Sequence, residues 1–443
     1  MVAVVDVQDP SRDIRDRVAT ASGIEEFPDK IWFHKLAAAV IDADRCVRCG
    51  TCVAACPSQS IDVATDGLPT LVRMCTGCSS CWDFCPLAGL RTERLARLWT
   101  ESQGNAAGEG QRDDASGSTQ PSSHATRFPP VAAPAMDRRD DIGPVRAAYE
   151  VRARDRASGA QDGGVVTALL TALLDQDYIQ AALLSHKEGP LRGKTVLAVT
   201  PEQVIRGAGS VYDQTYPLGV LTDRLPEQIH ELALVGTPCQ VAGLRALQRF
   251  PWGTRRAPAE KVKLAIALFC TRSFDTQRLA IELVRQGVDV SRVAKVDVRD
   301  GKFRTFDGAG TVILETGVRG LRRAALRGCD ECADLTGVLA DIAVGNVGSR
   351  PGYTTVLIRT ERGVEAWERV VDALDVTPLP DLRPVVELAA RNRARADRAR
   401  RRDAGADKSL WVRYREHLEA YLGTDRAPVT PPPHRSHHYT VAC

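Results

Sequence analysis

Eight of the thirteen cysteines in this 443-residue chain form two copies of one spacing, C-x2-C-x2-C-x3-C-P. The first copy contains Cys46, Cys49, Cys52 and Cys56, and the second, 29 residues further on, contains Cys75, Cys78, Cys81 and Cys85. Three thiolates on a tight loop can bind three irons of a [4Fe–4S] cube, while the fourth cysteine reaches the neighbouring cube. We therefore expect one cluster on Cys46, Cys49, Cys52 and Cys85, and a second on Cys75, Cys78, Cys81 and Cys56.

Two other uses of cysteine fit this spacing less well. Zinc sites contain CxxC pairs, but they lack a third cysteine two residues on and a closing Cys-Pro. Disulfides need an oxidising compartment, for which the sequence gives no other sign. Pro57 and Pro86 break the chain direction where each fourth ligand must turn away from its own loop.

A further set of cysteines lies in the second half of the chain, beside predicted strand ends. Cys239 follows the strand that ends at Gly236, Cys270 follows an apolar strand, and Cys329 and Cys332 form a CxxC after a predicted helix. Parallel strands gather their carboxyl ends at one sheet edge, where ligands normally bind. Four cysteines meeting there suit a third [4Fe–4S] cluster or a zinc ion. Buried structural cysteines are the alternative, because free cysteine packs as a small apolar residue.

Glycine-rich loops are predicted at the same edge. Gly163 and Gly164 open a helix whose free N–H groups could accept a phosphate. Three more loops of this kind lie at residues 207–212, 236–238 and 345–349. None of them is a G-x-G-x-x-G that follows the first strand, so a standard dinucleotide site is not indicated. For each loop alone, a turn that needs glycine is the commoner explanation.

The elements that must position these residues divide the chain into five parts. We expect an adaptor at 1–45 with a short amphipathic helix, a two-cluster ferredoxin-like module at 46–100, a disordered linker at 101–142, an α/β domain at 143–423 and a disordered tail at 424–443. Strands alternate with helices in the α/β domain, which favours a mostly parallel sheet covered on both faces. Residues 293–315 instead predict an antiparallel β-hairpin around Asp-Gly, inserted in this domain.

Composition narrows the function classes. The net charge of +3 and the lack of a basic, aromatic-rich surface argue against nucleic-acid binding. The sequence shows no signal peptide and no apolar run of the roughly 20 residues that a membrane helix needs, so we expect a soluble cytoplasmic protein.

Residues 391–402 hold seven arginines and one aspartate. A solvated helix face is the favoured interpretation of this segment, and an anion or partner patch is the alternative.

Together these blocks resemble the coenzyme F420 hydrogenase/dehydrogenase beta-subunit family of iron–sulfur flavoproteins. The resemblance rests on the double cysteine motif and on five later blocks, which read GGVVTALL, GSVY, VGTPCQVAGL, FC and CxxC followed by ADIAVGNVGS. It covers about residues 30–420, without the linker. One departure is the helix start, which reads Gln-Asp-Gly-Gly where many relatives have Ser-Gly-Gly.

The resemblance implies a ferredoxin-like module joined to an α/β domain that binds FAD. It places the FAD contacts at Gly163, Gly164, Thr167, Ser210, Thr237, Gln240, Asn346 and Gly348. It also implies a third [4Fe–4S] cluster on Cys239, Cys270, Cys329 and Cys332. Thr167 and Gln240 are expected to hydrogen-bond near the flavin, and no protein acid or base is assigned.

The expected activity is electron transfer between a hydride carrier, coenzyme F420, and one-electron carriers through FAD and the clusters. The expected partner is ferredoxin or a separate hydrogenase or dehydrogenase catalytic subunit, and a homo-oligomer is left open. Two alternatives remain. One is a ferredoxin-dependent reductase of an organic, tetrapyrrole-type substrate, and the other is an electron-relay subunit without a substrate of its own.

Overall fold

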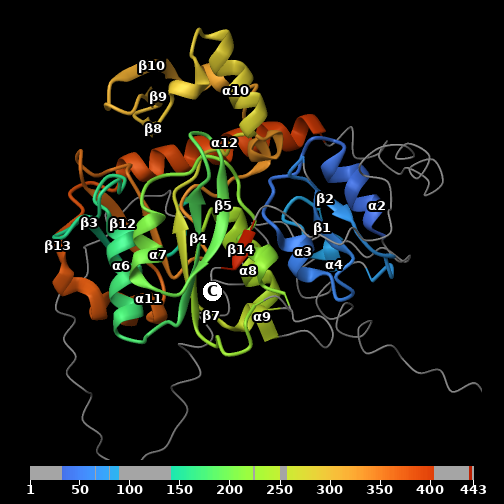
Figure 1. Cartoon of the computed structure of the whole chain (residues 1–443), viewed down its shortest axis with the longest axis horizontal. Helices are drawn as coiled ribbons and strands as arrows, with labels where there is room; N and C mark the ends of the chain where they lie inside the picture. Colours follow the sequence, from blue (N-terminus) through green and yellow to red (C-terminus); the bar gives the residue numbers. More distant parts are fainter. Residues whose placement is uncertain are drawn as a thin grey trace, which may run out of the picture.

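A computed structural model describes residues 32–64, 66–78, 80–88, 141–222, 225–249, 257–403 and 439–441. Most of the predicted adaptor, linker and tail therefore lies outside the described residues. The largest element is a nine-stranded sheet (Figure 1). Its order is β13 (Leu374–Pro378), β3 (Ala147–Ala153), β12 (Thr354–Ile358), β11 (Ile342–Gly345), β7 (Val262–Leu268), β6 (Leu232–Gly236), β4 (Ala181–Lys187), β5 (Gly193–Ala198) and β14 (Tyr439–Val441).

The sheet is mixed, and the predicted parallel arrangement is confirmed only at its centre. Strands β11, β7, β6 and β4 are parallel neighbours. In contrast, β12, β3 and β13 on one side pair antiparallel with their neighbours, and on the other side β5 pairs antiparallel with β4 and parallel with the edge strand β14. The connections from β4 to β5 and from β11 to β12 are short, and a short connection can join only antiparallel strands.

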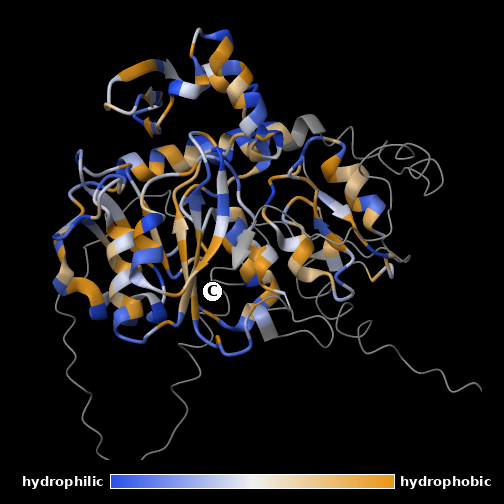
Figure 2. Ribbon diagram, viewed as in Figure 1, coloured by the Kyte–Doolittle hydropathy of each residue, from blue (hydrophilic) through white to orange (hydrophobic). Residues whose placement is uncertain are grey.

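Helices cover both faces of this sheet. One face carries α6 (Val165–Asp175), α7 (Pro201–Arg206) and α11 (Glu361–Val370), which share an apolar core with the strands. The opposite face carries α8 (Pro238–Arg249), with the short α9 (Ala257–Glu260) nearby. The central strands are buried and apolar over most of their length, and the end of β4, which is blue in Figure 2, is polar and partly exposed. Such uninterrupted apolar runs are typical of strands covered on both sides.

The cysteine-rich module is small and packs directly on the α8 face. It contains α3 (Thr51–Ala55), α4 (Ser80–Asp83), and the antiparallel pair β1 (Ile61–Val63) and β2 (Pro69–Leu71). The expected helix before it is confirmed as α2 (Phe33–Leu36), which continues into a π-helical turn at Ala37–Ile41. Its apolar residues belong to the same core cluster as α8, so no solvent layer separates the two parts. Figure 1 shows the module in blue beside α8.

The predicted inserted hairpin is present and has a third strand. Strands β8 (Lys295–Arg299), β9 (Lys302–Phe306) and β10 (Val312–Gly317) form a separate antiparallel sheet. Asp300 and Gly301 make the first turn with φ values of 53° and 71°, as a two-residue hairpin of this kind requires. The small sheet has its own core with α10 (Thr276–Arg285), and both stand out at the top of Figure 1.

The arginine-rich segment belongs to a long helix, α12 (Arg383–Asp403), which runs across the sheet edge in Figure 1. Short 3-10 turns occupy Pro217–Val220, Val290–Arg292, Val318–Leu321, Arg327–Glu331 and Val371–Ala373. Of the helices in the described ranges, none has the length and apolar character needed to cross a membrane.

Candidate iron–sulfur centres and flavin loops

The two cysteine loops of the module have the same local conformation. In the first, the Arg48 N–H donates to Cys46 Sγ at 3.4 Å, and in the second the Gly77 N–H donates to Cys75 Sγ at 3.4 Å. Arg48 and Gly77 occupy equivalent positions, and both have positive φ, 54° and 67°. Each loop therefore points a sulfur inward and aims a backbone N–H at it, as a cluster loop must.

The likeness extends to the hydroxyl that follows each second cysteine. Cys49 Sγ lies 3.2 Å from Thr51 Oγ1, and Cys78 Sγ lies 3.4 Å from Ser80 Oγ. Hydrogen bonds to cluster sulfurs are among the factors that set reduction potential. The repeat is therefore one of structure as well as of cysteine spacing.

The thiols of the module lie close enough to act on one another's pKa. Burial raises the pKa of Cys52, and the nearby thiols of Cys49, Cys46, Cys81 and Cys85 raise it further. Burial also raises the pKa of Cys85 to about 12, again with Cys49 and Cys46 as neighbours. We call Cys46, Cys49, Cys52 and Cys85 the inner set. Two thiols of the first loop therefore act on the pKa of Cys85, although its own motif belongs to the second loop, and its place in the inner set stays a prediction.

The remaining thiols of the module form what we call the outer set, Cys56, Cys75, Cys78 and Cys81. Burial raises the pKa of Cys75, and among the charges acting on it are the thiols of Cys56 and Cys78. Cys56, Cys75 and Cys78 are partly exposed and only Cys81 is buried. All eight donors are thiols, which suits iron–sulfur chemistry.

The third set, Cys239, Cys270, Cys329 and Cys332, also comes together. Cys239 lies in the first turn of α8, Cys270 follows β7, and the CxxC lies in the turn at 327–332. Burial raises the pKa of Cys270 to about 12, with Cys329 the next cause. Burial likewise raises the pKa of Cys239, to which the Cys49, Cys332 and Cys270 thiols add. These neighbours support the predicted convergence of the four cysteines at the carboxyl ends of the parallel strands.

No group of three or more His, Cys, Asp or Glu side chains within the described ranges is placed to hold a metal ion. The three sets are therefore recognised from their spacing, their chemistry and their effects on one another's pKa. Iron binding requires thiolates, so loading these thiols must release protons.

Gln214 is a polar contact of the third set that the sequence did not single out. Its side-chain N–H groups donate to Thr237 Oγ1 at 3.0 Å and to Cys239 Sγ at 3.6 Å. Its carbonyl accepts from Ser273 Oγ at 2.7 Å, and that hydroxyl lies 3.9 Å from Cys270 Sγ. Nothing in the sequence pattern marks Gln214, because it lies in an irregular segment between the GSVY block and the next strand.

Cationic residues also surround the CxxC. Arg395 of α12 donates to the backbone carbonyl of Cys329 at 3.0 Å and to that of Thr271 at 2.9 Å. Arg272 pairs with Asp330, inside the CxxC, at 2.7 Å. At least this part of the arginine-rich segment contacts the protein interior, so the interpretation as a purely solvated helix face is too simple.

The predicted flavin residues fall into two groups. The first surrounds the start of α6. Gly164 is its N-cap, with a φ of 69°, and Thr167 lies in its first turn. An added Cβ on Gly209 would lie 3.0 Å from the Gly159 carbonyl, so the loop that contains Ser210 borders the loop before α6. Asn346 shares a hydrogen bond with Asp162, just before the two glycines.

Gly163 is needed for close packing. A Cβ there would lie 2.4 Å from the Val151 carbonyl, and its N–H donates to Thr354 Oγ1 at 3.1 Å. Its backbone is therefore engaged with β3 and β12. Gly348, with a φ of 90°, turns the β11–β12 loop, which also contains Asn346, and an added Cβ there would lie 3.2 Å from Val385 of α12.

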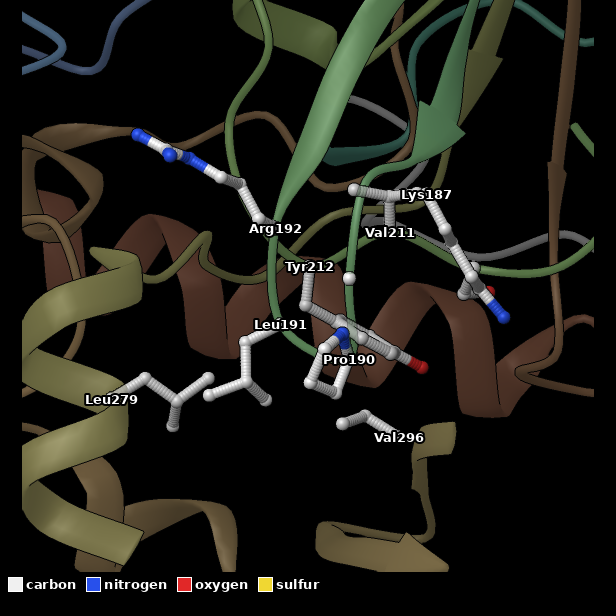
Figure 3. A pocket seen from close by; sticks show the side chains of 10 residues that line it. Lys187, Pro190, Leu191, Arg192, Val211, Tyr212, Leu279 and Val296 are labelled. Atoms are coloured by element: carbon white, nitrogen blue, oxygen red, sulfur yellow. The ribbon is translucent and has the colours of Figure 1, made fainter. Parts of the chain in front are cut away.

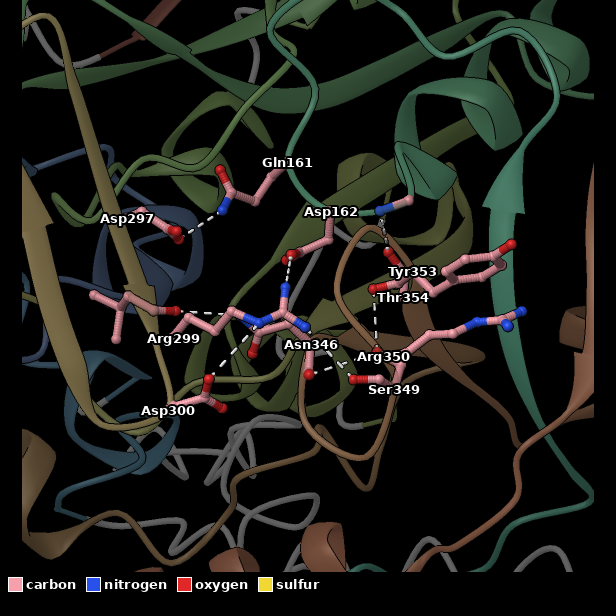
Figure 4. Close-up of polar contacts among 12 residues, drawn as sticks. Gln161, Asp162, Asp297, Arg299, Asp300, Asn346, Ser349, Arg350, Tyr353 and Thr354 are labelled. Carbon is pink, nitrogen blue, oxygen red and sulfur yellow. Dashed lines mark hydrogen bonds and ion pairs between the residues drawn. The ribbon is translucent and has the colours of Figure 1, made fainter. Parts of the chain in front are cut away.

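Figure 4 shows what the Gln-Asp that precedes Gly163 does. Gln161 donates to Asp297 at 2.6 Å, and Arg299 pairs with Asp162 at 2.7 Å. Both partners belong to β8, so these residues attach the inserted small sheet to the flavin loops. The unusual helix start thus has a structural role, and Arg299 is a site residue that the sequence analysis missed.

The second group, Thr237 and Gln240, lies with the third cysteine set. Thr237 Oγ1 is 3.2 Å from Cys239 Sγ. Gln240 is buried, its amide accepts from the Thr237 N–H at 2.8 Å, and it donates to the Thr215 carbonyl at 2.7 Å. Both ends of the Gln240 amide are therefore used within the protein, which makes it a support for the loop around Cys239.

A small surface pocket lies beside Ser210 (Figure 3). Lys187, Ser210 and Tyr212 line it from the sheet side, and Leu279 and Val296 line it from α10 and β8. Burial lowers the pKa of Lys187, with Lys295 a second cause. The pocket therefore lies between the flavin loops and the inserted small sheet.

Comparisons with known proteins cover both parts of the chain. Residues 148–222 match the N-terminal model of the coenzyme F420 hydrogenase/dehydrogenase beta subunit, and residues 229–381 match its C-terminal model. Residues 39–91 match a 4Fe-4S dicluster domain.

Two relatives and one solved structure extend this similarity. The coenzyme F420 hydrogenase subunit beta of Methanococcus voltae is 30% identical over 254 residues, 56% of this chain and 89% of that protein. The corresponding hydrogenase subunit beta of Methanothermobacter thermautotrophicus is 29% identical over 282 residues, 60% of this chain and 98% of that protein. A chain of the F420-reducing [NiFe] hydrogenase complex from Methanosarcina barkeri superposes with a TM-score of 0.55 at 27% identity, over 58% of this chain and 92% of that chain.

Proposed function

Because the chain belongs to the coenzyme F420 hydrogenase/dehydrogenase beta-subunit family and carries an N-terminal 4Fe-4S dicluster domain, we propose that it exchanges electrons between coenzyme F420 and a one-electron carrier. It is an iron–sulfur electron-transfer protein of that family. The proposal adds a bound FAD, a third cluster and F420 as the hydride donor or acceptor.

The observation that carries this proposal is a series of neighbouring candidate sites within one molecule, from the flavin loops to the outer set. The segment from Ser210 to Gln214 starts at the flavin loops and ends at the third cysteine set, through the contacts of Gln214. Cys49 of the inner set then acts on the pKa of Cys239 in the third set. The inner set neighbours the outer set through Cys52 and Cys81. The order that these contacts support is flavin loops, third set, inner set and outer set.

FAD would supply the chemistry that joins the two kinds of carrier, because it accepts a hydride and gives up single electrons. The residues fit such a group in part. Gly164 and Thr167 lie at the start of α6, whose first-turn N–H groups have no partner within the helix, and Ser210, Asn346 and Gly348 lie on the two loops that border the segment before it. These five are the residues that we expect to hold it, with Gly163 as a packing glycine. Thr237 and Gln240 instead stabilise the loop of Cys239.

The third set fits a four-iron cluster by the chemistry of its donors. The Cys332 and Cys270 thiols act on the pKa of Cys239, and Gln214 and Thr237 place polar groups near Cys239. Such hydrogen bonds and nearby charges tune the potential of a cluster. Arg395 and Arg272 add positive charge beside the CxxC, which favours the reduced, more negative state of a cluster.

The proposed partners would bind at the two ends of this series of sites, the flavin loops and the outer set. F420 would approach the flavin loops, and a ferredoxin or a hydrogenase or dehydrogenase subunit would approach the outer set, three of whose four thiols are partly exposed. The solved relative comes from an F420-reducing [NiFe] hydrogenase complex. This supports an assembly in which another chain supplies the second substrate site.

The test is an anaerobic assay of the purified full chain with reduced F420 as donor and ferredoxin or a one-electron dye as acceptor. We expect on the order of 12 irons per chain, one FAD and F420-dependent reduction of the acceptor. About eight irons would remove the third cluster. Flavin that is reduced by ferredoxin and never by F420 would replace the proposal with the ferredoxin-dependent reductase of an organic substrate.

A further inference from the structure

A buried ion pair joins the module to the turn that carries the CxxC. Arg45 Nε lies 2.6 Å from Glu331 Oε1, and its Nη2 donates to Glu331 Oε2 at 2.7 Å. Both residues are 6% exposed. A guanidinium and a carboxylate joined by two parallel hydrogen bonds are fixed in direction as well as in distance. The two residues are 286 positions apart in sequence, so the pair is a long-range contact between two parts of the fold.

The two residues stand next to the proposed ligands. Arg45 immediately precedes Cys46 of the inner set, and Glu331 lies between Cys329 and Cys332 of the third set. Arg45 also donates to the Leu87 carbonyl at 3.2 Å, two residues after Cys85. One guanidinium therefore contacts the chain beside both ends of the inner set and the chain inside the CxxC.

The backbones are in contact at the same place. An added Cβ on Gly328 would lie 1.8 Å from the Arg45 carbonyl oxygen, so only glycine fits there. Arg45 further donates to the Ala39 carbonyl at 2.8 Å, which ties it to the π-helical turn before the module. The position of the first cysteine loop relative to the CxxC is thus over-determined by polar and steric contacts.

We propose that Arg45 and Glu331 are positioning residues that set the separation of the inner and third cysteine sets for electron transfer between them. The inference rests on the proposed function, because it assumes a cluster in each set. With a cluster held by each set, the step would be a single electron exchange, in which one cluster would lose the electron that the other gains. No bond is made or broken and no proton moves.

The principal variant is Arg45→Lys, which keeps the positive charge and loses the fork that makes two parallel bonds. Glu331→Gln is the second variant, since it keeps the shape and removes the charge. Two control variants are matched to these. Arg278→Lys alters another ion pair between the module and the domain, Arg278–Asp44 at 2.9 Å, which is partly exposed. Arg245→Lys alters a buried pair within the α/β domain, Arg245–Asp341 at 2.8 Å.

Each full-length variant is first measured for iron and flavin content. The readouts are the magnetic coupling between reduced clusters in electron paramagnetic resonance spectra and the rate at which reduced flavin passes electrons to the module in a stopped-flow experiment. We expect Arg45→Lys and Glu331→Gln to keep their iron, to lose coupling between the inner and third sets, and to slow this transfer at least about tenfold, as small displacements of reacting groups can. Both control variants should match the wild type in coupling and rate.

The outcomes separate this inference from the proposed function. Wild-type protein without flavin or with only about eight irons would defeat the proposed function before any variant is compared. Full iron and flavin with wild-type coupling and rate in both variants would overturn the positioning role alone. Loss of inner-set iron in both variants would also overturn it, because the pair would then be needed for assembly of the site. Equal slowing in the Arg245→Lys control would show a general loss of rigidity, which again removes the specific role.

Discussion

The two cysteine loops of the module share one sequence spacing and one local conformation, yet their surroundings are opposite. Three of the four inner thiols are buried, whereas only one outer thiol is. The first loop is enclosed by the α/β domain, with Thr51 completely buried, and Tyr216 against Gly50. The second loop has Met74 beside it, which is 86% exposed. The two loops therefore share a spacing and differ in burial, because the first loop and not the second is enclosed by the α/β domain.

The largest effect should come from removing one thiolate from each loop. Cys49→Ser replaces an inner ligand with a harder, poorer one. We expect flavin reduction by F420 to persist in a single turnover, and electron transfer to a dye or ferredoxin to fall on the order of 100-fold. Cys78→Ser should spare the exchange between flavin and inner set and slow only transfer out of the module. Stopped-flow absorbance at flavin and cluster wavelengths measures both. Equal effects of the two variants on the internal step would contradict the inner and outer assignment.

A second large effect is expected where the first loop meets α8. An added Cβ on Gly243 would lie 2.0 Å from Thr51 Oγ1, so Gly243→Ala must push the module from the domain. We expect a loss of about 1–3 kcal/mol in the free energy of unfolding, as overpacking usually costs. Gly308→Ala is the matched control, because its Cβ would meet no atom within 4 Å. Chemical denaturation of both variants provides the measurement, and similar midpoints for the two would show that this contact is loose.

Thiol reactivity should distinguish the loops in iron-free protein. Burial raises the pKa of Cys85 to about 12, so this inner thiol stays protonated at pH 8 and gains thiolate only as the pH approaches 12. The thiolate is the reactive form. Alkylation at pH 8 followed by mass spectrometry should therefore label the partly exposed Cys75 and Cys78 before Cys49, Cys52 and Cys85. Labelling of the inner thiols before the outer thiols would contradict the expected difference in reactivity between the two sets.

The smallest effect is expected from a residue of the first loop whose side chain makes its backbone conformation strained. Arg48 has a φ of 54° where the second loop has Gly77. A side chain in this conformation costs about 1–2 kcal/mol, which Arg48→Gly would relieve. The same change removes the ion pair of Arg48 with Asp275. We expect the two terms to leave the free energy of unfolding within about 1 kcal/mol of the wild type. Gly77→Ala adds backbone strain and forms no new favourable contact. It should therefore lower the free energy of unfolding more than Arg48→Gly does.

The sequence was most informative where chemistry depends on local spacing. The double cysteine motif predicted the 4Fe-4S dicluster domain that residues 39–91 match, and the exchange of Cys56 and Cys85 between the loops stays a prediction. The Asp300-Gly301 turn likewise marked the inserted hairpin, because its positive φ values demand such residues.

Long-range contacts could not be predicted in this way. Arg45 and Glu331 are 286 residues apart, and Gln161 meets Asp297 across 136 positions, with no periodicity to link them. Gln240 was assigned to the flavin from its motif, whereas its buried amide bonds to the backbone of Thr215 and Thr237. The antiparallel flanks of the sheet were missed because alternation of strands and helices does not reveal which strands join by short turns.

The module and the α/β domain share an apolar core while belonging to the same polypeptide. Tethering turns their association into an intramolecular event, whose effective concentration depends on the length and stiffness of the connecting segment. A weakened contact at the junction therefore lowers the docked fraction without releasing the module. A module supplied as a separate chain would have to reach comparable concentrations to replace it. Fusion of this kind lets a small interface serve where two independent proteins would need a much larger one.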